Sequence, residues 1–234
     1  MKIAMWSGPR NLSTAMMYAF AARGDCAVWD EPFYAAWLTA TGGPHPMASR
    51  IVATHDSDPA TVAARCDGPP PDGMAHFYMK HMPHHMSADF PLGWAGGCVN
   101  AHLIRHPARV LASYAAKREA VSFDDIGFAA QAEFFERFPG PVIDSADIRR
   151  DPRDTLSRFC AEIGLPFTER MLSWPPGPKP FDGVWAAHWY GAVHRSTGFA
   201  QAEGQLPPVA PEHEAIHARA LPIYEALSRH AIRR

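Results

Sequence analysis

The chain has few cysteines and little excess of charge of either sign. Its four cysteines form no C-x-x-C pair, which argues against a zinc ribbon or a disulfide framework and favours a reducing compartment, the cytoplasm. The formal net charge is −2 over 234 residues. An extended nucleic-acid surface would need a basic stripe, so we expect no nucleic-acid partner.

Long apolar runs are also missing. No window approaches the roughly 20 apolar residues of a membrane-spanning helix. The first apolar stretch is interrupted by Ser7, Gly8 and Pro9, and therefore predicts a buried first strand rather than a signal peptide. With 47% hydrophobic and 20% charged residues, the chain has the composition of a globular protein. Its length fits a single domain, residues 1–234.

Short apolar runs alternate with helical patterns along the first two thirds of the chain. This alternation predicts an α/β fold of three layers, in which a mostly parallel sheet is flanked by helices. In such sheets ligands bind at the carboxyl ends of the strands. The predicted strands are 2–7, 26–29, 76–80, 98–104 and 140–144, the predicted helices 107–119, 123–138, 152–163 and 211–231, and the predicted connections 42–46, 67–73 and 173–183.

The turn after the first predicted strand has the features of an anion-binding loop. Gly8 and Pro9 make a turn that delivers Arg10, Ser13 and Thr14 to the start of a helix. A helix N-terminus presents free N–H groups and a positive dipole end, and arginine adds forked donors. The second glycine and the lysine of a Walker A loop are absent. The alternative is an ordinary turn with a serine N-cap.

A second basic site follows the predicted strand 98–104. Arg105 ends that strand, Pro107 suits the first turn of a helix, and Ser113 lies on its second turn. A guanidinium and a hydroxyl so placed can hold one phosphate from two sides. Taken alone, the pair is better explained by a surface arginine and an ordinary helical serine.

Together these motifs resemble the sulfotransferases that use 3′-phosphoadenosine 5′-phosphosulfate. Residues 9–14 are similar to that family's first loop, and the eight-residue spacing of Arg105 and Ser113 is similar to its second motif. Residues 141–166 are similar to the strand, the Asp-Pro helix and the Gly-Leu-Pro segment that follow in the family. The resemblance implies a P-loop NTPase-like sulfotransferase fold, this nucleotide as donor, and no metal. It also implies the donor-binding residues, which are Gly8, Pro9, Arg10, Asn11, Leu12, Ser13 and Thr14 at the 5′ end, Arg105 and Ser113 at the 3′-phosphate, and Arg195 in a late basic loop.

Sulfuryl transfer needs a base beside the acceptor and positive charge beside the leaving phosphate. Glu31 follows the second predicted strand and resembles the carboxylate base of several family members. His81 follows the third and resembles the histidine base of another branch. We favour Glu31, with His81 as second choice, and assign Arg10 and Lys80 to charge stabilisation. The alternatives are that Glu31 is a carboxylate at a helix start, that His81 is a hydrogen-bonded histidine at a strand end, and that Lys80 is a solvated lysine.

Other readings of the sequence stay open. A P-loop kinase would need a Walker A lysine and a magnesium-binding carboxylate. A non-catalytic nucleotide-binding module is favoured by Asn11-Leu12, where the family commonly has Ser-Gly. The His213–His217 segment fits an H-E-x-x-H zinc pattern, and His81, His84 and His85 form a second cluster. The acceptor is expected to be a small molecule or lipid with a hydroxyl or amine; the sequence does not indicate an oligomeric state.

Overall fold

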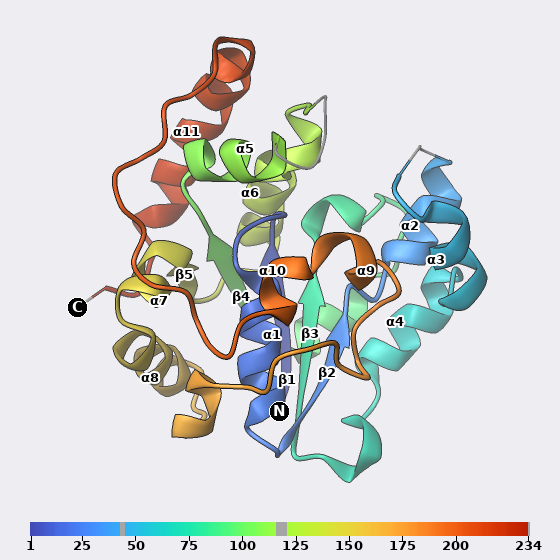
Figure 1. The fold of residues 1–234 in the computed structure, drawn as a ribbon. Coiled ribbons are helices and arrows are strands. Elements are labelled where there is room, and N and C mark those ends of the chain that lie inside the picture. Colours follow the sequence, from blue (N-terminus) through green and yellow to red (C-terminus); the bar gives the residue numbers. More distant parts are fainter. Residues whose placement is uncertain (43–44, 116–120, 234) are drawn as a thin grey trace.

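A computed structural model describes residues 1–42, 45–115 and 121–233. All strand pairs are parallel, and the order in the sheet is β2-β3-β1-β4-β5 (Figure 1). The predicted α/β fold is confirmed, and each predicted strand is found with its ends shifted by at most two residues. The strands are β1 (Lys2–Ser7), β2 (Cys26–Asp30), β3 (His76–His81), β4 (Val99–Ile104) and β5 (Val142–Asp144).

Alternate residues of each central strand enter different hydrophobic cores. Ile3 and Met5 of β1 pack into one core, whereas Ala4 and Trp6 pack into another. Successive side chains of a strand point to opposite faces of the sheet, so both faces are covered. This is why the run Ile3–Trp6 in β1 is continuously apolar rather than alternating.

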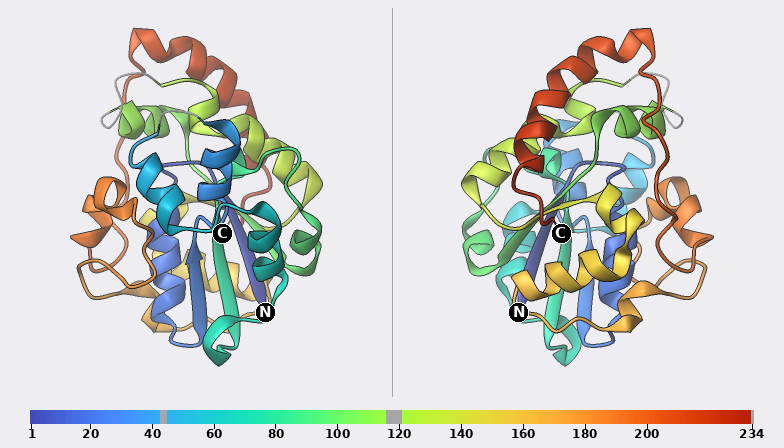
Figure 2. Two further views of the ribbon diagram at one scale, coloured as in Figure 1. Left: turned by 90° about the vertical axis from the view of Figure 1, so that its right-hand side faces the viewer. Right: turned by 90° about the vertical axis from the view of Figure 1, so that its left-hand side faces the viewer.

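Helices cover both faces of the sheet (Figure 2). Residues of α1 and α8 belong to the core that contains Ile3, and residues of α4 and α6 to the core that contains Trp6. No helix within the described ranges is both long and apolar enough to cross a bilayer. The α-helices are α1 (Ser13–Ala22), α2 (Tyr34–Thr41), α3 (Ala48–Thr54), α4 (Pro59–Asp67), α5 (Pro107–Ala115), α6 (Phe128–Arg137), α7 (Ser145–Arg150), α8 (Pro152–Glu162), α9 (Ala186–Trp189), α10 (Gly191–His194) and α11 (Glu214–Ser228).

The predicted helix 123–138 is wrong at its start. A 3₁₀ turn (Asp124–Ile126) ends at Gly127, which has a φ of 71°, and α6 begins only after it. A Cβ at Gly127 would lie 3.0 Å from His84 Nδ1 and 3.5 Å from Pro9 Cδ. The chain bends here because its backbone packs against the first loop.

The other helical predictions hold with shorter bounds. The predicted helix 107–119 is α5 as far as Ala115, and its remaining residues lie outside those described. The predicted helix 211–231 starts as a 3₁₀ turn (Pro211–His213) before α11. The predicted connection 67–73 includes the last residue of α4 and a 3₁₀ turn (Pro71–Gly73). The predicted connection 173–183 contains no helix or strand. In the predicted connection 42–46, residues 43–44 lie outside the described residues.

Candidate functional site

The loop after β1 has an unusual backbone. Arg10 has a φ of 63° and Leu12 has a φ of 75°, and residues other than glycine rarely adopt such values. Leu12 is the N-cap of α1 and makes no side-chain cap hydrogen bond, so the interpretation of this loop as a turn capped by a serine is wrong. The first N–H groups of a helix have no partner within it, and no N-cap side chain takes that place in α1. Ser13, Thr14 and Ala15 of this first turn line a cavity.

Two further residues of this loop hold its shape. Asn11 is buried, and its Nδ2 donates to the Leu103 carbonyl oxygen at 3.1 Å. This bond fastens the loop to β4. A Cβ on Gly8 would come within 3.0 Å of the Ile126 carbonyl oxygen, so the loop passes close to the neighbouring backbone. Among the predicted loop residues, Pro9, Arg10, Leu12, Ser13 and Thr14 line the cavity; Gly8 and Asn11 do not.

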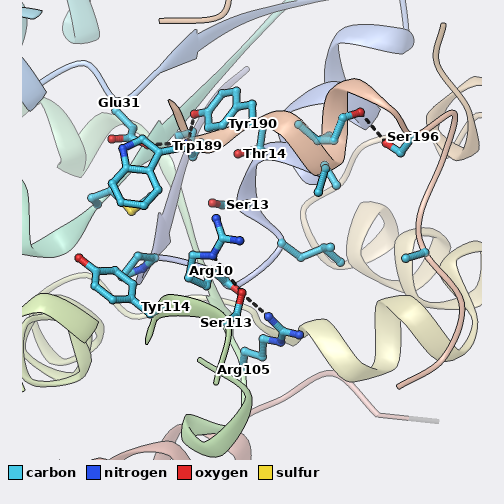
Figure 3. Close-up of a pocket in the computed structure, with 18 of the residues that line it drawn as sticks. Arg10, Ser13, Thr14, Glu31, Arg105, Ser113, Tyr114, Trp189, Tyr190 and Ser196 are labelled. Atoms are coloured by element: carbon cyan, nitrogen blue, oxygen red, sulfur yellow. Dashed lines mark hydrogen bonds and ion pairs between the residues drawn. The ribbon is translucent and has the colours of Figure 1, made fainter. Parts of the chain in front are cut away.

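The two predicted basic motifs meet in the fold (Figure 3). Arg10 Nε donates to Ser113 Oγ at 3.0 Å, and Arg105 donates through one terminal nitrogen to the Arg10 carbonyl oxygen at 2.7 Å. Burial, together with the charge of Arg105, lowers the pKa of Arg10. The carboxyl end of β4, helix α5 and the loop after β1 thus place two guanidinium groups and a hydroxyl at one end of the cavity.

A buried ionic cluster forms the other end. Lys80, at the end of β3, is 1% exposed. Its Nζ lies 2.8 Å from Asp30 Oδ1, 2.7 Å from Glu31 Oε1 and 2.6 Å from the Tyr190 hydroxyl. Asp30 ends β2, so the parallel strands bring these groups together. Tyr190 also donates to Asp30 and accepts a bond from Trp185 Nε1.

Burial shifts the pKa values in this cluster. It raises the pKa of the Glu31 carboxyl, an effect that the charge of Lys80 only partly opposes. Burial alone would lower the pKa of Lys80, but the charges of Asp30 and Glu31 hold it above its ordinary value. One ammonium thus faces two carboxylates, and a carboxyl with a raised pKa is better suited to accept a proton near neutral pH.

His81 lies apart from this cluster. Lys80 and His81 are neighbours on β3 and point to opposite faces of the sheet. The His81 ring stacks on Trp6, with centroids 4.7 Å apart, and lies 4.8 Å from the Trp94 ring. Burial lowers the pKa of His81 to about 3. Lys80 and Glu31 line the cavity; His81 does not.

One cavity of about 260 Å³ joins the two ends. Arg195 is exposed and does not line it, whereas Ser196 and Gly198 of the same segment do. Around the carboxylate the wall consists mainly of aromatic and histidine rings. Burial lowers the pKa of His84 to about 4 and that of His85 well below its ordinary value. These wall residues are Tyr34, His45, His84, His85, Tyr114, Trp189 and Tyr190.

The two histidine patterns have different positions. His84 and His85 belong to the cavity wall. His213 lies in the 3₁₀ turn before α11 and His217 in the helix itself. Among residues 1–42, 45–115 and 121–233, no three His, Cys, Asp or Glu side chains are grouped as metal ligands would be.

Sequence reasoning missed several residues of the site. Asp30 stands beside Glu31 at the end of a predicted strand, and this position was a usable signal. Tyr190 and Trp189 belong to a visible aromatic group, but nothing local indicates which ring contacts Lys80, 110 residues away. Arg149 also lines the cavity, and no motif marks it.

Comparison with known proteins identifies relatives over nearly the whole chain. The family description "Sulfotransferase domain" matches residues 1–231. The branched-chain-amino-acid aminotransferase-like proteins 1 and 2 of Arabidopsis thaliana are 35% and 33% identical to it over 97% of the chain. The chain spans only 42% and 41% of those relatives.

Two solved structures share the fold. The sulfotransferase domain from the curacin biosynthetic pathway superposes with a TM-score of 0.56 at 14% identity, covering 93% of this chain and 96% of that one. The sulfotransferase domain from the Synechococcus PCC 7002 olefin synthase gives a TM-score of 0.50 at 16% identity, covering 97% and 94%. At these identities the likeness concerns the fold alone.

Proposed function

The chain belongs to the sulfotransferase domain family, and we propose that it transfers a sulfuryl group from 3′-phosphoadenosine 5′-phosphosulfate to a hydroxyl or amine of a small organic acceptor. One observation carries the proposal. A single cavity has guanidinium groups and a helix N-terminus at one end and a buried carboxylate–lysine cluster at the other. The two ends correspond to the two requirements of this reaction, an anionic leaving group and an acceptor proton.

The cationic end suits the donor. Ser13, Thr14 and the free N–H groups of α1 would hold the 5′-phosphosulfate, with Arg10 beside them. Arg105 and Ser113 would hold the 3′-phosphate. Arg105 Nε is buried and has no hydrogen-bond partner within the described residues. An unpartnered buried donor is costly, and an anionic oxygen would satisfy it.

The donor supplies the sulfuryl group, and the side chains of this chain deal with the proton and the charge. As the acceptor oxygen or nitrogen bonds to sulfur, the bond from sulfur to the 5′-phosphate oxygen breaks. Glu31 takes the acceptor proton, and Lys80, 2.7 Å away, holds the carboxylate in place. Arg10 neutralises the charge that develops on the leaving phosphate.

Glu31 is the better candidate for the base than His81. Glu31 lines the cavity together with the residues assigned to the donor. The His81 ring is packed against two tryptophans. A base must come within hydrogen-bond reach of the proton that it takes, which favours Glu31. Glu31 acts as a base when it is deprotonated, and its pKa is raised. As the pH is lowered, the rate of transfer should therefore begin to fall at a pH above the usual pKa range of glutamate.

The aromatic wall around Glu31 suits an acceptor with an apolar body. Tyr34, Trp189 and Tyr190 offer rings, and the buried histidines offer neutral hydrogen-bonding nitrogens. A small hydroxylated molecule or a lipid alcohol would bury its carbon skeleton against these rings while its hydroxyl faces Glu31.

The proposal is tested first by binding. Adenosine 3′,5′-bisphosphate should raise the melting temperature, and Mg-ATP should not. At one hundred times its dissociation constant, a ligand that binds only the folded protein increases the free energy of unfolding by about 2.7 kcal/mol. Stabilisation by Mg-ATP alone would favour a kinase instead. The second step is transfer of radiolabelled sulfuryl groups to a panel of alcohols and amines. Binding of the bisphosphate without transfer to any acceptor would favour a non-catalytic module.

A further inference from the structure

A single carboxylate ion-pairs with three arginines beside the cavity. Glu203 has a side chain only 4% exposed and lies in the segment between Gly198 and Pro211, which has neither helix nor strand. Its Oε1 lies 2.6 Å from a terminal nitrogen of Arg149, and its Oε2 lies 3.1 Å from Arg109 Nε. Arg105 donates to the same Oε1. The arginines come from three places: the end of β4, α5 and α7.

The arginines also bind the backbone on both sides of Glu203. Arg149 Nε donates to the Gln201 carbonyl oxygen at 2.9 Å, and Arg109 donates to the Gly204 carbonyl oxygen. We call residues 201–204 the strap. Figure 1 draws it, orange to red, passing α7 on its way to α11. These bonds hold the strap next to Arg105 and Arg149 of the cavity wall.

The charges are unequal. Three guanidinium groups share one carboxylate, and the charges of all three arginines hold the pKa of Glu203 below its ordinary value, although burial alone would raise it. A guanidinium fork fits phosphate as well as carboxylate. A phosphate carries more negative charge than a carboxylate and has a third oxygen, so it matches three arginines better than Glu203 does.

The two anions compete for the same donors. Arg105 and Arg149 line the cavity, and both are bonded to Glu203 Oε1. Donors that are committed to Glu203 are not available to a phosphate in the cavity. The partnerless Arg105 Nε points to the same conclusion, because the carboxylate leaves part of the arginine's capacity unused.

We propose that Arg105 and Arg149, which line the cavity, bind one phosphate while Arg109 adds positive charge next to them, and that Glu203 occupies this site in the free protein and leaves when a phosphate group of the nucleotide binds. This inference rests on the proposed function, which brings a nucleotide bisphosphate into the cavity. Glu203 then sets the affinity. Binding is weakened by the fraction of molecules in which the carboxylate holds the site, and the strap must move for the donor to enter or leave.

The decisive variant is Glu203→Gln, which keeps the size of the side chain and removes its charge. Adenosine 3′,5′-bisphosphate should bind this variant about tenfold more tightly or better, as measured by calorimetry. Adenosine 5′-monophosphate, which lacks the second phosphate, should bind as it does to the wild type. Glu169→Gln, which breaks the exposed pair with Arg153, is the matched control and should change neither affinity. If the wild type binds the bisphosphate, equal or weaker binding by Glu203→Gln would overturn the inference.

A second measurement needs no variant. Hydrogen exchange of the wild type should show faster exchange in residues 201–206 when the bisphosphate is bound, because the strap has been released. Slower exchange there would contradict the proposal and would make Glu203 a structural anchor. Inorganic phosphate separates this inference from the proposed function. If the bisphosphate binds neither protein but inorganic phosphate binds Glu203→Gln more tightly, the proposed donor fails and the arginine site stands. If both proteins bind the bisphosphate equally, the donor stands and the role of Glu203 fails.

Discussion

The two ends of the cavity are both ionic, but with opposite imbalance of charge. At one end Lys80, 1% exposed, faces two carboxylates and a tyrosine hydroxyl. At the other, arginine side chains 15 to 22% exposed share the carboxylate of Glu203. The first end has spare negative charge in a water-poor setting, which suits proton transfer. The second has spare positive charge near solvent, which suits an entering anion. The two ends thus differ in burial as well as in the sign of their excess charge.

The largest effect is expected at the buried end. Glu31→Gln keeps the shape of the side chain but cannot accept a proton. It should slow sulfuryl transfer by about 10²–10⁴-fold while the bisphosphate binds as before, as measured by single-turnover kinetics and calorimetry. The matched variant His81→Gln, on the other face of the sheet, should lose far less rate. If Glu31→Gln stays active and His81→Gln does not, the histidine is the base.

The next effect concerns stability at the same end. Lys80→Met leaves Asp30 and Glu31 buried without their cation, which should lower the free energy of unfolding by about 3–5 kcal/mol. Urea denaturation measures this loss. Lys2→Met is the control, because Lys2 pairs with the exposed Asp67 and such a pair contributes about 0–1 kcal/mol. Similar losses in both variants would mean that the buried cluster has no special role in stability.

A smaller effect is expected at the arginine end. Arg105→Ala should weaken binding of adenosine 3′,5′-bisphosphate by about 1.5–3 kcal/mol, the range for charged hydrogen bonds. It should leave the free energy of unfolding less affected than Lys80→Met does. Arg153→Ala removes an exposed arginine that does not line the cavity and should not change the affinity. Unchanged affinity in Arg105→Ala would remove this residue from the site.

The last effect is a pH dependence at His81. Its pKa is about 3 in the folded chain and about 6.5 when exposed, so between these values the unfolded chain binds more protons. The neutral ring therefore contributes fully to the free energy of unfolding above about pH 6.5. Below that pH the contribution decreases by up to about 1.4 kcal/mol for each pH unit. His81→Gln should flatten the profile of melting temperature between pH 7 and pH 5. An unchanged slope would show that other groups account for it.

Local spacing was enough to predict much of the fold. Continuous apolar runs such as Ile3–Trp6 mark strands buried on both faces, and Gly-Pro after such a run marks a strand-to-helix turn. The start of α6 could not be predicted, because Gly127 bends the chain where it meets Pro9, more than one hundred residues earlier. Periodicity carries no information about such an approach.

Local sequence accounts for the parallel sheet and for the loop that carries Arg10, because strand periodicity and turn chemistry act between neighbouring residues. It also placed Glu31 and Lys80 at strand ends, where parallel strands must share an edge. The tertiary structure alone decided that Tyr190 contacts Lys80 and that Glu203 contacts Arg105, across separations of 110 and 98 residues. Such contacts depend on how the chain returns over the sheet, and no local pattern encodes that path.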